Sequence, residues 1–482
     1  MARKSERKRI SALKHDSLVY RREVPRESVG AGTFGGVPYD KKIVLVGRIM
    51  LTDRTGYISK LGLFDVLGER EVILLERIEG DGVSVPAYLV RTPENIQTMN
   101  STIHYGDIVM IEGIKLCIDN SDIFLGEKIG LLSKSIGDVY DSNIDFRKKS
   151  NLYTHRHLQL IRDQEKLSRF RRCSLVLRVI RQFLYQRGYE EVNITLLQKS
   201  FEAGLAEPFV THAIEHNKDV FLRLTSELLL WRLMIAGFSK VFEIGKSFRN
   251  QNATTNTLPQ FTLLELYHAY VDQEEMEGLA RDIILEILVQ LYGSTLLPTS
   301  GGIIDCSYEW PIYDFREEVK KHARLLYNEE CPIAELLCML DKMEISRPAI
   351  VNKYTIATAM YSSVMSKIKG PAFLRNLPAA QSPLYKLNDD GSTVDESLLI
   401  VSGRPVVTIV NPERDPEIVQ RRMEEQLLYR KDGQNGGVNE DILRAMRLGL
   451  PPCRGMAIGF EHLLMLLLNT EDIRDVELFP VF

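Results

Sequence analysis

Two apolar stretches separated by a polar loop, within residues 240–270, constrain the fold of this 482-residue chain most strongly. Both stretches, residues 241–248 and 261–269, alternate between apolar and polar side chains as β-strands do. The segment between them, NQNATTNTLP, is rich in Asn and Thr and ends in Pro, which is typical of a loop. The pattern therefore predicts a long antiparallel hairpin.

Four side chains of this predicted hairpin suit a small, charged, aromatic ligand. Arg249 follows the first strand and can neutralise a phosphate or carboxylate through two parallel hydrogen bonds. Phe261 opens the second strand and can stack on a base. Glu265, two residues before Tyr267, can bind an ammonium group. The alternative is a hairpin with a charged rim and no ligand, and the local pattern does not decide between the two.

The composition is that of an ordinary folded protein of two or three domains. Hydrophobic residues make up 44% of the chain, and the net charge of −4 gives no general attraction to nucleic acid. The six cysteines form no C-x-x-C pair, which favours reduced thiols over a zinc site or disulfides. No apolar run is long enough to span a membrane, and no secretory signal is visible. We therefore expect a cytoplasmic protein without membrane contact.

Changes in residue pattern divide the chain into domains. Residues 1–40 begin with a basic run, which forms either an arm that contacts RNA phosphates or a solvated tail. Residues 41–135 hold five short β-type runs separated by turns, the pattern of a five-stranded OB-type β-barrel. Residues 136–165 form a polar linker, and residues 166–482 form a larger domain with a helical insertion at about 275–345. The predicted fold class is α+β.

Residues 248–267, FRNQNATTNTLPQFTLLELY, resemble motif 2 of the class II aminoacyl-tRNA synthetases. The lysyl-tRNA synthetase branch is the most similar, with F-R-N-E-G followed by H-N-P-E-F-T and E-L-Y. The predicted helix over residues 167–184 and the strand after it resemble motif 1, and residues 448–480 resemble motif 3. The resemblance implies an antiparallel catalytic sheet flanked by helices, an N-terminal OB domain that reads the anticodon, and a homodimer formed through motif 1.

The resemblance also implies roles for seven residues at matching positions. Arg249 would contact the α-phosphate and the amino-acid carboxylate that react during adenylate formation, and it is the one candidate catalytic residue. Candidate ATP-binding residues are Arg249, Phe261 and His462, the last in place of the motif 3 Arg. Candidate amino-acid-binding residues are Gly204, Glu227, Glu265 and Tyr267. Simpler structural roles stay open for two of them. Glu227 could be an acid that stabilises a helix N-terminus through the helix dipole, and His462 could lie at the edge of a buried helix without contacting a ligand.

The chain departs from the family at charged positions. The family has three evenly spaced Glu residues, of which two hold Mg²⁺ and the third binds the lysine side-chain ammonium. With Gly403 and Arg404 as the anchor, these positions hold Leu398, Pro405 and Pro412. A shift of one residue would bring in Glu413 and a shift of two Glu396, but no single register recovers all three acids. No metal ligand is therefore predicted.

These departures predict a chain that has lost the attachment of lysine to tRNA. Adenylate formation needs metal, phosphate cations and positioning, and the motif 2 loop has also lost family charges or titratable groups at Gln251, Asn256, Thr257 and Gln260. The expected ligand is a small amino-acid-like or nucleotide-like molecule, with ATP a candidate and Mg²⁺ not expected. Two alternatives stay open: an active ATP-dependent ligase with another carboxylate substrate or acceptor, and an OB-domain scaffold that binds tRNA, other RNA or protein.

Overall fold

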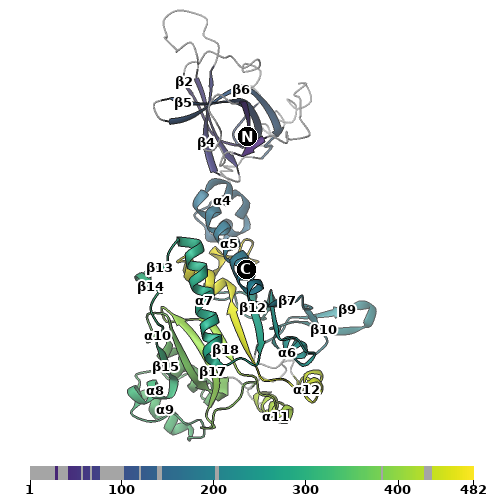
Figure 1. Ribbon diagram of the computed structural model, residues 1–482, viewed down its shortest axis with the longest axis vertical. Helices are drawn as coiled ribbons and strands as arrows, with labels where there is room; N and C mark the ends of the chain where they lie inside the picture. Colours follow the sequence, from purple (N-terminus) through teal and green to yellow (C-terminus); the bar gives the residue numbers. More distant parts are fainter. Residues whose placement is uncertain are drawn as a thin grey trace, which may run out of the picture. The chain divides into compact units, whose positions relative to one another are not determined.

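The chain forms two compact units, Met1–Arg162 and Asp163–Phe482 (Figure 1). The computed structural model describes residues 28–30, 42–55, 58–65, 68–75, 103–118, 121–137, 144–200, 206–381, 384–427 and 437–481. Within these ranges, no helix combines the length and the apolar character needed to cross a membrane. The predicted basic arm, residues 1–40, lies outside the described residues except for a short strand, β1.

A ring of five strands forms most of the described part of the first unit. Strands β2, β3, β4, β6 and β5 pair in that order, and β5 pairs again with β2 to close the ring. Buried Leu45, Ile49, Val109 and Phe124 belong to its hydrophobic core. The number of strands agrees with the five predicted within residues 41–135, and the OB-type assignment itself remains a prediction. The strands are β1 (Ser28–Gly30), β2 (Lys42–Thr55), β3 (Ile58–Asp65), β4 (Gly68–Leu75), β5 (Ile108–Ile118) and β6 (Ser121–Ser133).

Two short helices, α3 (Lys149–Thr154) and α4 (Arg156–Arg162), lie where the sequence predicts a linker. Arg156 is fully buried, and its Nη1 donates a hydrogen bond to Gln159 Oε1 at 2.6 Å. Its guanidinium also lies 5.1 Å from the centroid of the Tyr153 ring. Residues 149–162 are therefore helices around a buried arginine.

An eight-stranded sheet is the centre of the second unit, with the order β15-β16-β17-β18-β19-β12-β11-β7. Its six central strands pair antiparallel, and the edge strands β15 and β7 are parallel to their neighbours. The predicted hairpin is β11 and β12, with bounds within one residue of the prediction. The strands are β7 (Glu190–Glu191), β11 (Lys240–Phe248), β12 (Gln260–Ala269), β15 (Ile312–Asp314), β16 (Ala372–Pro378), β17 (Thr393–Val401), β18 (Arg404–Val410) and β19 (Cys453–Gly459).

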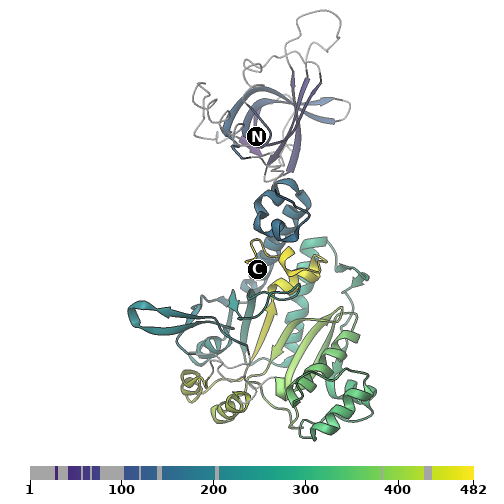
Figure 2. The same ribbon diagram turned by 180° about the vertical axis from the view of Figure 1, so that it is seen from behind.

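Helices pack on both faces of this sheet, which confirms the α+β class. Figure 1 shows α7 in front of the strands, and Figure 2 shows the strands in front of α7. On the α7 face, Nη1 and Nη2 of Arg454 donate to the Asp395 carboxylate at 3.0 and 2.9 Å, and Nη1 also donates to Gln273 of α7. The helices are α5 (Gln164–Gln186), α6 (Glu227–Ile235), α7 (Gln273–Tyr292), α8 (Phe315–Ala323), α9 (Ile333–Lys342), α10 (Lys353–Lys367), α11 (Pro416–Leu427), α12 (Glu440–Met446) and α13 (Phe460–Leu467).

The predicted helical insertion at about 275–345 also contains strands. Helices α7, α8 and α9 lie in this segment, α7 beginning at its start. Between α7 and α8 the chain forms a hairpin, β13 (Leu296–Thr299) and β14 (Gly302–Asp305), and then the edge strand β15. A further small sheet of β8 (Leu197–Gln198), β9 (Val210–Ala213) and β10 (Lys218–Leu222) projects from the large sheet (Figures 1 and 2).

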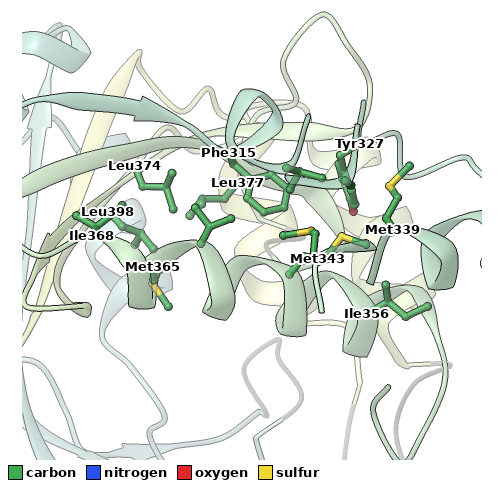
Figure 3. Packing of buried hydrophobic residues seen from close by; sticks show 14 of the residues in the cluster. Phe315, Tyr327, Met339, Met343, Ile356, Met365, Ile368, Leu374, Leu377 and Leu398 are labelled. Atoms are coloured by element: carbon green, nitrogen blue, oxygen red, sulfur yellow. The ribbon is translucent and has the colours of Figure 1, made fainter. Parts of the chain in front are cut away.

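A hydrophobic cluster between α8–α10 and the strands β16 and β17 covers the part of the sheet face opposite α7 that these two strands form (Figure 3). Leu374 and Leu398 enter it from the strands, and Phe315, Met365 and Ile368 contribute from the helical side. Leu398 is only 5% exposed. The position where the family resemblance expects a metal-binding carboxylate is therefore part of an apolar core.

We predict that Leu398→Ala lowers the free energy of unfolding of the second unit by about 2–5 kcal/mol, because it leaves a cavity in this cluster. The matched control is Leu448→Ala, since Leu448 is 81% exposed and its truncation should change stability by less than about 0.5 kcal/mol. Urea unfolding followed by tryptophan fluorescence measures both, because both tryptophans, Trp231 and Trp310, are buried in this unit. Equal unfolding midpoints for the two variants would contradict the burial of Leu398.

Candidate functional site

Two rows of cross-strand neighbours form the face of the sheet opposite α7. Residues paired across strands share a face, and so do residues two apart along a strand. From β12, β19, β18 and β17 in that order, the first row contains Glu265, Ala457, Thr408 and Leu398. From the same strands, the second row contains Tyr267, Gly455, Val410 and Glu396. We call this the binding face, because it carries two of the predicted amino-acid-binding residues.

Tyr267 and Glu227 contact each other at this face. The Tyr267 hydroxyl donates a hydrogen bond to Glu227 Oε1 at 2.8 Å. Burial raises the pKa of Tyr267 well above its usual value, and the Glu227 carboxylate raises it further, so the phenol stays protonated and donates. Its ring lies over Gly455, where an added Cβ would be 2.5 Å from Tyr267 Cζ. A glycine on β19 is therefore what allows the ring to reach Glu227.

Glu265 holds the start of α6. Its carboxylate accepts hydrogen bonds from the backbone nitrogen of Ser226 at 2.6 Å, from the Ser226 hydroxyl at 2.5 Å and from the Thr225 hydroxyl. These donors directly precede Glu227, the first residue of α6. Glu265 thus positions Glu227, and with three protein donors it keeps one lone-pair position for a ligand. The remaining predicted residue of this group, Gly204, lies outside the described residues.

The three predicted ATP-binding residues line one hollow of about 150 Å³ beside the binding face, together with residues of the motif 2 loop. The guanidinium carbon of Arg249 lies 5.0 Å from the centroid of the Phe261 ring, a cation–π contact. Neighbouring protein atoms exclude water from the Arg249 guanidinium, and this desolvation lowers its pKa. The negative charge of Glu265 raises the pKa of Arg249 and so offsets part of the effect. His462 forms another side of the hollow.

Contacts outside the hairpin hold the motif 2 loop. Nε2 of His462 lies 2.7 Å from the backbone oxygen of Asn256 and therefore donates to it. The backbone nitrogen of Ile473, in the 3₁₀ turn Ile473–Asp475, donates to the oxygen of Thr255 at 2.8 Å. His462, which the resemblance assigns to the phosphate side, thus has a structural partner in the loop.

Glu461 also lines the hollow, and the sequence analysis did not identify it. Its buried carboxylate accepts hydrogen bonds from the backbone nitrogen and hydroxyl of Thr262, with shortest distances of 2.8 and 2.7 Å. This contact connects the start of α13, where His462 lies, to Thr262, the third residue of β12. The acid directly before His462 in the motif 3 segment was the signal available in the sequence.

The positions of the family's three acids offer no oxygen ligands for Mg²⁺. Leu398 lies in the apolar cluster, and Pro405 is exposed on β18. Pro412 is buried and forms an isolated antiparallel β-bridge with Tyr385. The neighbouring Glu413 accepts hydrogen bonds from the backbone of the two residues that follow it. Across the part of the chain that the structure describes, no three His, Cys, Asp or Glu side chains are grouped as metal ligands. This donor set does not fit a hard cation.

Glu329 and Tyr385 also belong to this region, and the sequence analysis did not identify them. Glu329 Oε2 accepts a hydrogen bond from the backbone nitrogen of Ala380 at 3.1 Å, in the turn that leads toward Tyr385. Burial raises the pKa of Glu329 to about 7. Burial also raises the pKa of Tyr385 well above its usual value, followed by the charges of Glu227, Glu396 and Glu265. Tyr385 is therefore hydrogen-bonded to Glu227 and lies within the electrostatic influence of Glu396 and Glu265.

We predict that Gly455→Ala destabilises the second unit by about 1–3 kcal/mol, because the new methyl group displaces the Tyr267 ring. The matched control is Gly278→Ala on α7, where an added Cβ meets no atom within 4 Å. That change should stabilise the helix by up to about 1 kcal/mol. Thermal unfolding measures both variants, and equal shifts would contradict the close approach of Tyr267 to β19.

We predict a pH-dependent gain in stability for Glu329→Gln. The pKa of Glu329 is raised from 4.5 to about 7 in the folded protein, so the native state binds the extra proton and its stability falls as the pH rises from about 4.5 to 7. Gln removes this loss and can still accept from Ala380. The variant should gain roughly 2–3 kcal/mol relative to the unmodified chain between pH 5 and pH 8. Unfolding midpoints measure this, with the exposed Glu330→Gln as control; parallel pH profiles for Glu329→Gln and the unmodified chain would contradict it.

Comparison with known proteins agrees with this geometry. Residues 148–482 match the family model of the class II tRNA synthetases (D, K and N). Over 449 residues the chain is 31% identical to the lysine–tRNA ligase of Fervidobacterium nodosum, covering 92% of this chain and 84% of that protein. It is 30% identical over 453 residues to the lysine–tRNA ligase of Thermosipho africanus, covering 93% and 87%. The chain therefore belongs to the class II tRNA synthetase family (D, K and N) and is similar to its lysine–tRNA ligases.

Proposed function

We propose that this chain is a divergent lysyl-tRNA synthetase-like protein that binds an amino-acid-like ligand and has lost the attachment of lysine to tRNA. One observation carries the proposal: Leu398, at a position where the family resemblance expects a Mg²⁺-binding Glu, is buried in the cluster under α10. Mg²⁺ needs oxygen ligands, and a carboxylate at this position would be surrounded by apolar side chains.

The phosphate side of the site supports the same proposal. Arg249 remains there as a cation, but His462 replaces the second Arg that the resemblance expects and is hydrogen-bonded to the loop. Losing one electrostatic contact to a transition state commonly costs a factor of about 10²–10³ in rate. Several such losses together leave little adenylate formation, even if ATP binds between Arg249 and Phe261.

The amino-acid side supports ligand binding. Glu227 and Tyr267 are hydrogen-bonded to each other, and Glu265 fixes the segment that carries Glu227. An α-ammonium group placed beside Glu227 would leave the ligand's carboxylate free for Arg249, whose guanidinium is suited to a two-pronged contact. This half of the site requires no metal.

We also propose a homodimer, with tRNA or another RNA as a further partner. Exposed apolar side chains lie at the end of α5 (Tyr185), at and just before β8 (Leu197 and Leu196), on β9 (Val210) and in the turn after it (Ile214). Where such side chains form one contiguous patch, the patch is typical of an interface. They lie on the segments next to the predicted motif 1, which supports the dimer that the resemblance implies.

We predict that the chain does not catalyse lysine-dependent exchange of pyrophosphate into ATP above the enzyme-free rate in the presence of Mg²⁺, because the metal ligands are missing. The lysine–tRNA ligase of Thermosipho africanus, assayed in parallel, is the positive control. Robust Mg²⁺-dependent exchange with lysine would contradict the proposed loss of activity.

A second candidate is an active ligase that joins a different carboxylate to an acceptor. The pairing of Glu227 with Tyr267, together with Arg249 at the neighbouring hollow, favours it. Thermal-shift measurements with single amino acids, each with and without ATP, separate the two functions. Stabilisation by an amino acid alone supports the first candidate, and stabilisation that requires ATP supports the second.

A further inference from the structure

The residues assigned to the amino-acid side of the site are covered by the chain itself. Tyr267 is 2% exposed, Glu265 is 6% exposed, and Glu227 is half-buried. The hollow of about 150 Å³ is lined by Arg249 on the phosphate side but not by these three residues. A free amino acid can bind only where the binding residues are accessible to it, so part of the chain must first move aside.

Tyr385 is the side chain placed to provide this cover. It is hydrogen-bonded to Glu227, the acid that also accepts a hydrogen bond from Tyr267 at 2.8 Å. Tyr385 lies within the electrostatic influence of Glu265, and it and Arg249 lie within electrostatic range of each other. Its phenol therefore lies among the predicted amino-acid-binding residues, on the way from them to the cation of the phosphate side.

The Tyr385 side chain also packs against two separate hydrophobic clusters. One is the cluster of α8–α10 with β16 and β17, which contains Leu398. The other surrounds α6 and α12 and contains Tyr267 and Trp231. Leu398 on β17 and Tyr267 on β12 stand at opposite ends of the rows that form the binding face. A side chain in contact with both clusters therefore reaches across that face.

Backbone contacts hold Tyr385 in this place. It forms an antiparallel β-bridge with Pro412, and the backbone nitrogen of Lys386 donates to the oxygen of Asn411 at 2.8 Å. Nη1 of Arg422, on α11, donates to the backbone oxygen of Tyr385 at 2.6 Å. The main chain is thus fixed on three sides, and the side chain can leave the site by changing its rotamer.

We propose that Tyr385 closes the amino-acid side of the site, and that its side chain must move away from Glu227 before an amino acid binds there. The inference rests on the proposed function, because it takes Glu227, Glu265 and Tyr267 as ligand-binding residues. In the closed form, the Tyr385 hydroxyl donates to the carboxylate that would receive the ligand's α-ammonium, and its ring fills the space beside that carboxylate. The affinity for a ligand is then reduced by the fraction of molecules that are open.

Isothermal titration calorimetry of the full chain with L-lysine and L-leucine tests this. Tyr385→Ala removes the ring, so we expect one or both amino acids to bind at least about 10-fold more tightly than to the unmodified chain, as an open fraction of 10% or less requires. Tyr385→Phe keeps the ring and loses only the hydrogen bond to Glu227, so binding should tighten less, by about 2- to 10-fold. The matched control is Tyr270→Ala, which should change nothing because Tyr270 is 78% exposed.

Phenol provides a second readout that does not depend on an amino acid. In Tyr385→Ala it should fill the space of the lost ring and raise the melting temperature, as ligands of an engineered cavity do. It should not stabilise Tyr270→Ala. Phenol should also compete with the bound amino acid in Tyr385→Ala, because both need the space beside Glu227.

The outcomes separate this inference from the proposed function. Equal affinity of Tyr385→Ala and the unmodified chain for a bound amino acid, or simultaneous binding of phenol and amino acid, overturns the role of Tyr385 and leaves amino-acid binding intact. Stabilisation by phenol without binding of either amino acid supports closure by Tyr385 and overturns the amino-acid proposal. If neither phenol nor an amino acid binds to Tyr385→Ala, both are overturned. Should the Ala variant not fold, Tyr385→Phe decides, and an unchanged affinity in it overturns the inference.

Discussion

The antiparallel register of β12, β19, β18 and β17 is the constraint on which the site depends. It aligns residues more than a hundred positions apart, such as Glu265 on β12 and Leu398 on β17, on one face. A shift of one residue would move every side chain of a strand to the other face. Because Glu396 and Leu398 share a face, the same strand presents a carboxylate toward Tyr385 and an apolar side chain to α10.

The polar residues that remain in the site also hold the fold together. Glu265 binds the residues before α6, Glu461 ties α13 to β12, and His462 holds the loop at Asn256. Removing one partner from the buried contacts of Glu265 or Glu461 leaves an unsatisfied group and costs about 1–3 kcal/mol. These residues therefore stabilise the protein whether or not it forms an adenylate.

The sequence predicted the elements better than the contacts between them. The hairpin of β11 and β12 was recognisable because alternating apolar residues flank a loop rich in Asn and Thr, and Arg249, Phe261 and His462 do line one hollow. The contact of His462 with Asn256 joins residues 206 positions apart, and that of Glu329 with Ala380 joins residues 51 apart. No local pattern encodes such pairs. The strands in the predicted helical insertion, β13 to β15, were missed because they are only three or four residues long.

The location of Leu398 would make a metal-binding acid difficult to place at this position. Counting along the sequence treats this position as one missing acid, which a single substitution would restore. In the structure the position is closed by α8–α10, and Phe315, Leu374 and Ile368 belong to the same cluster. An ionised carboxylate there would either shift its pKa and become neutral or force the helices away from the sheet. A metal-binding carboxylate at this position would thus require repacking of the whole cluster.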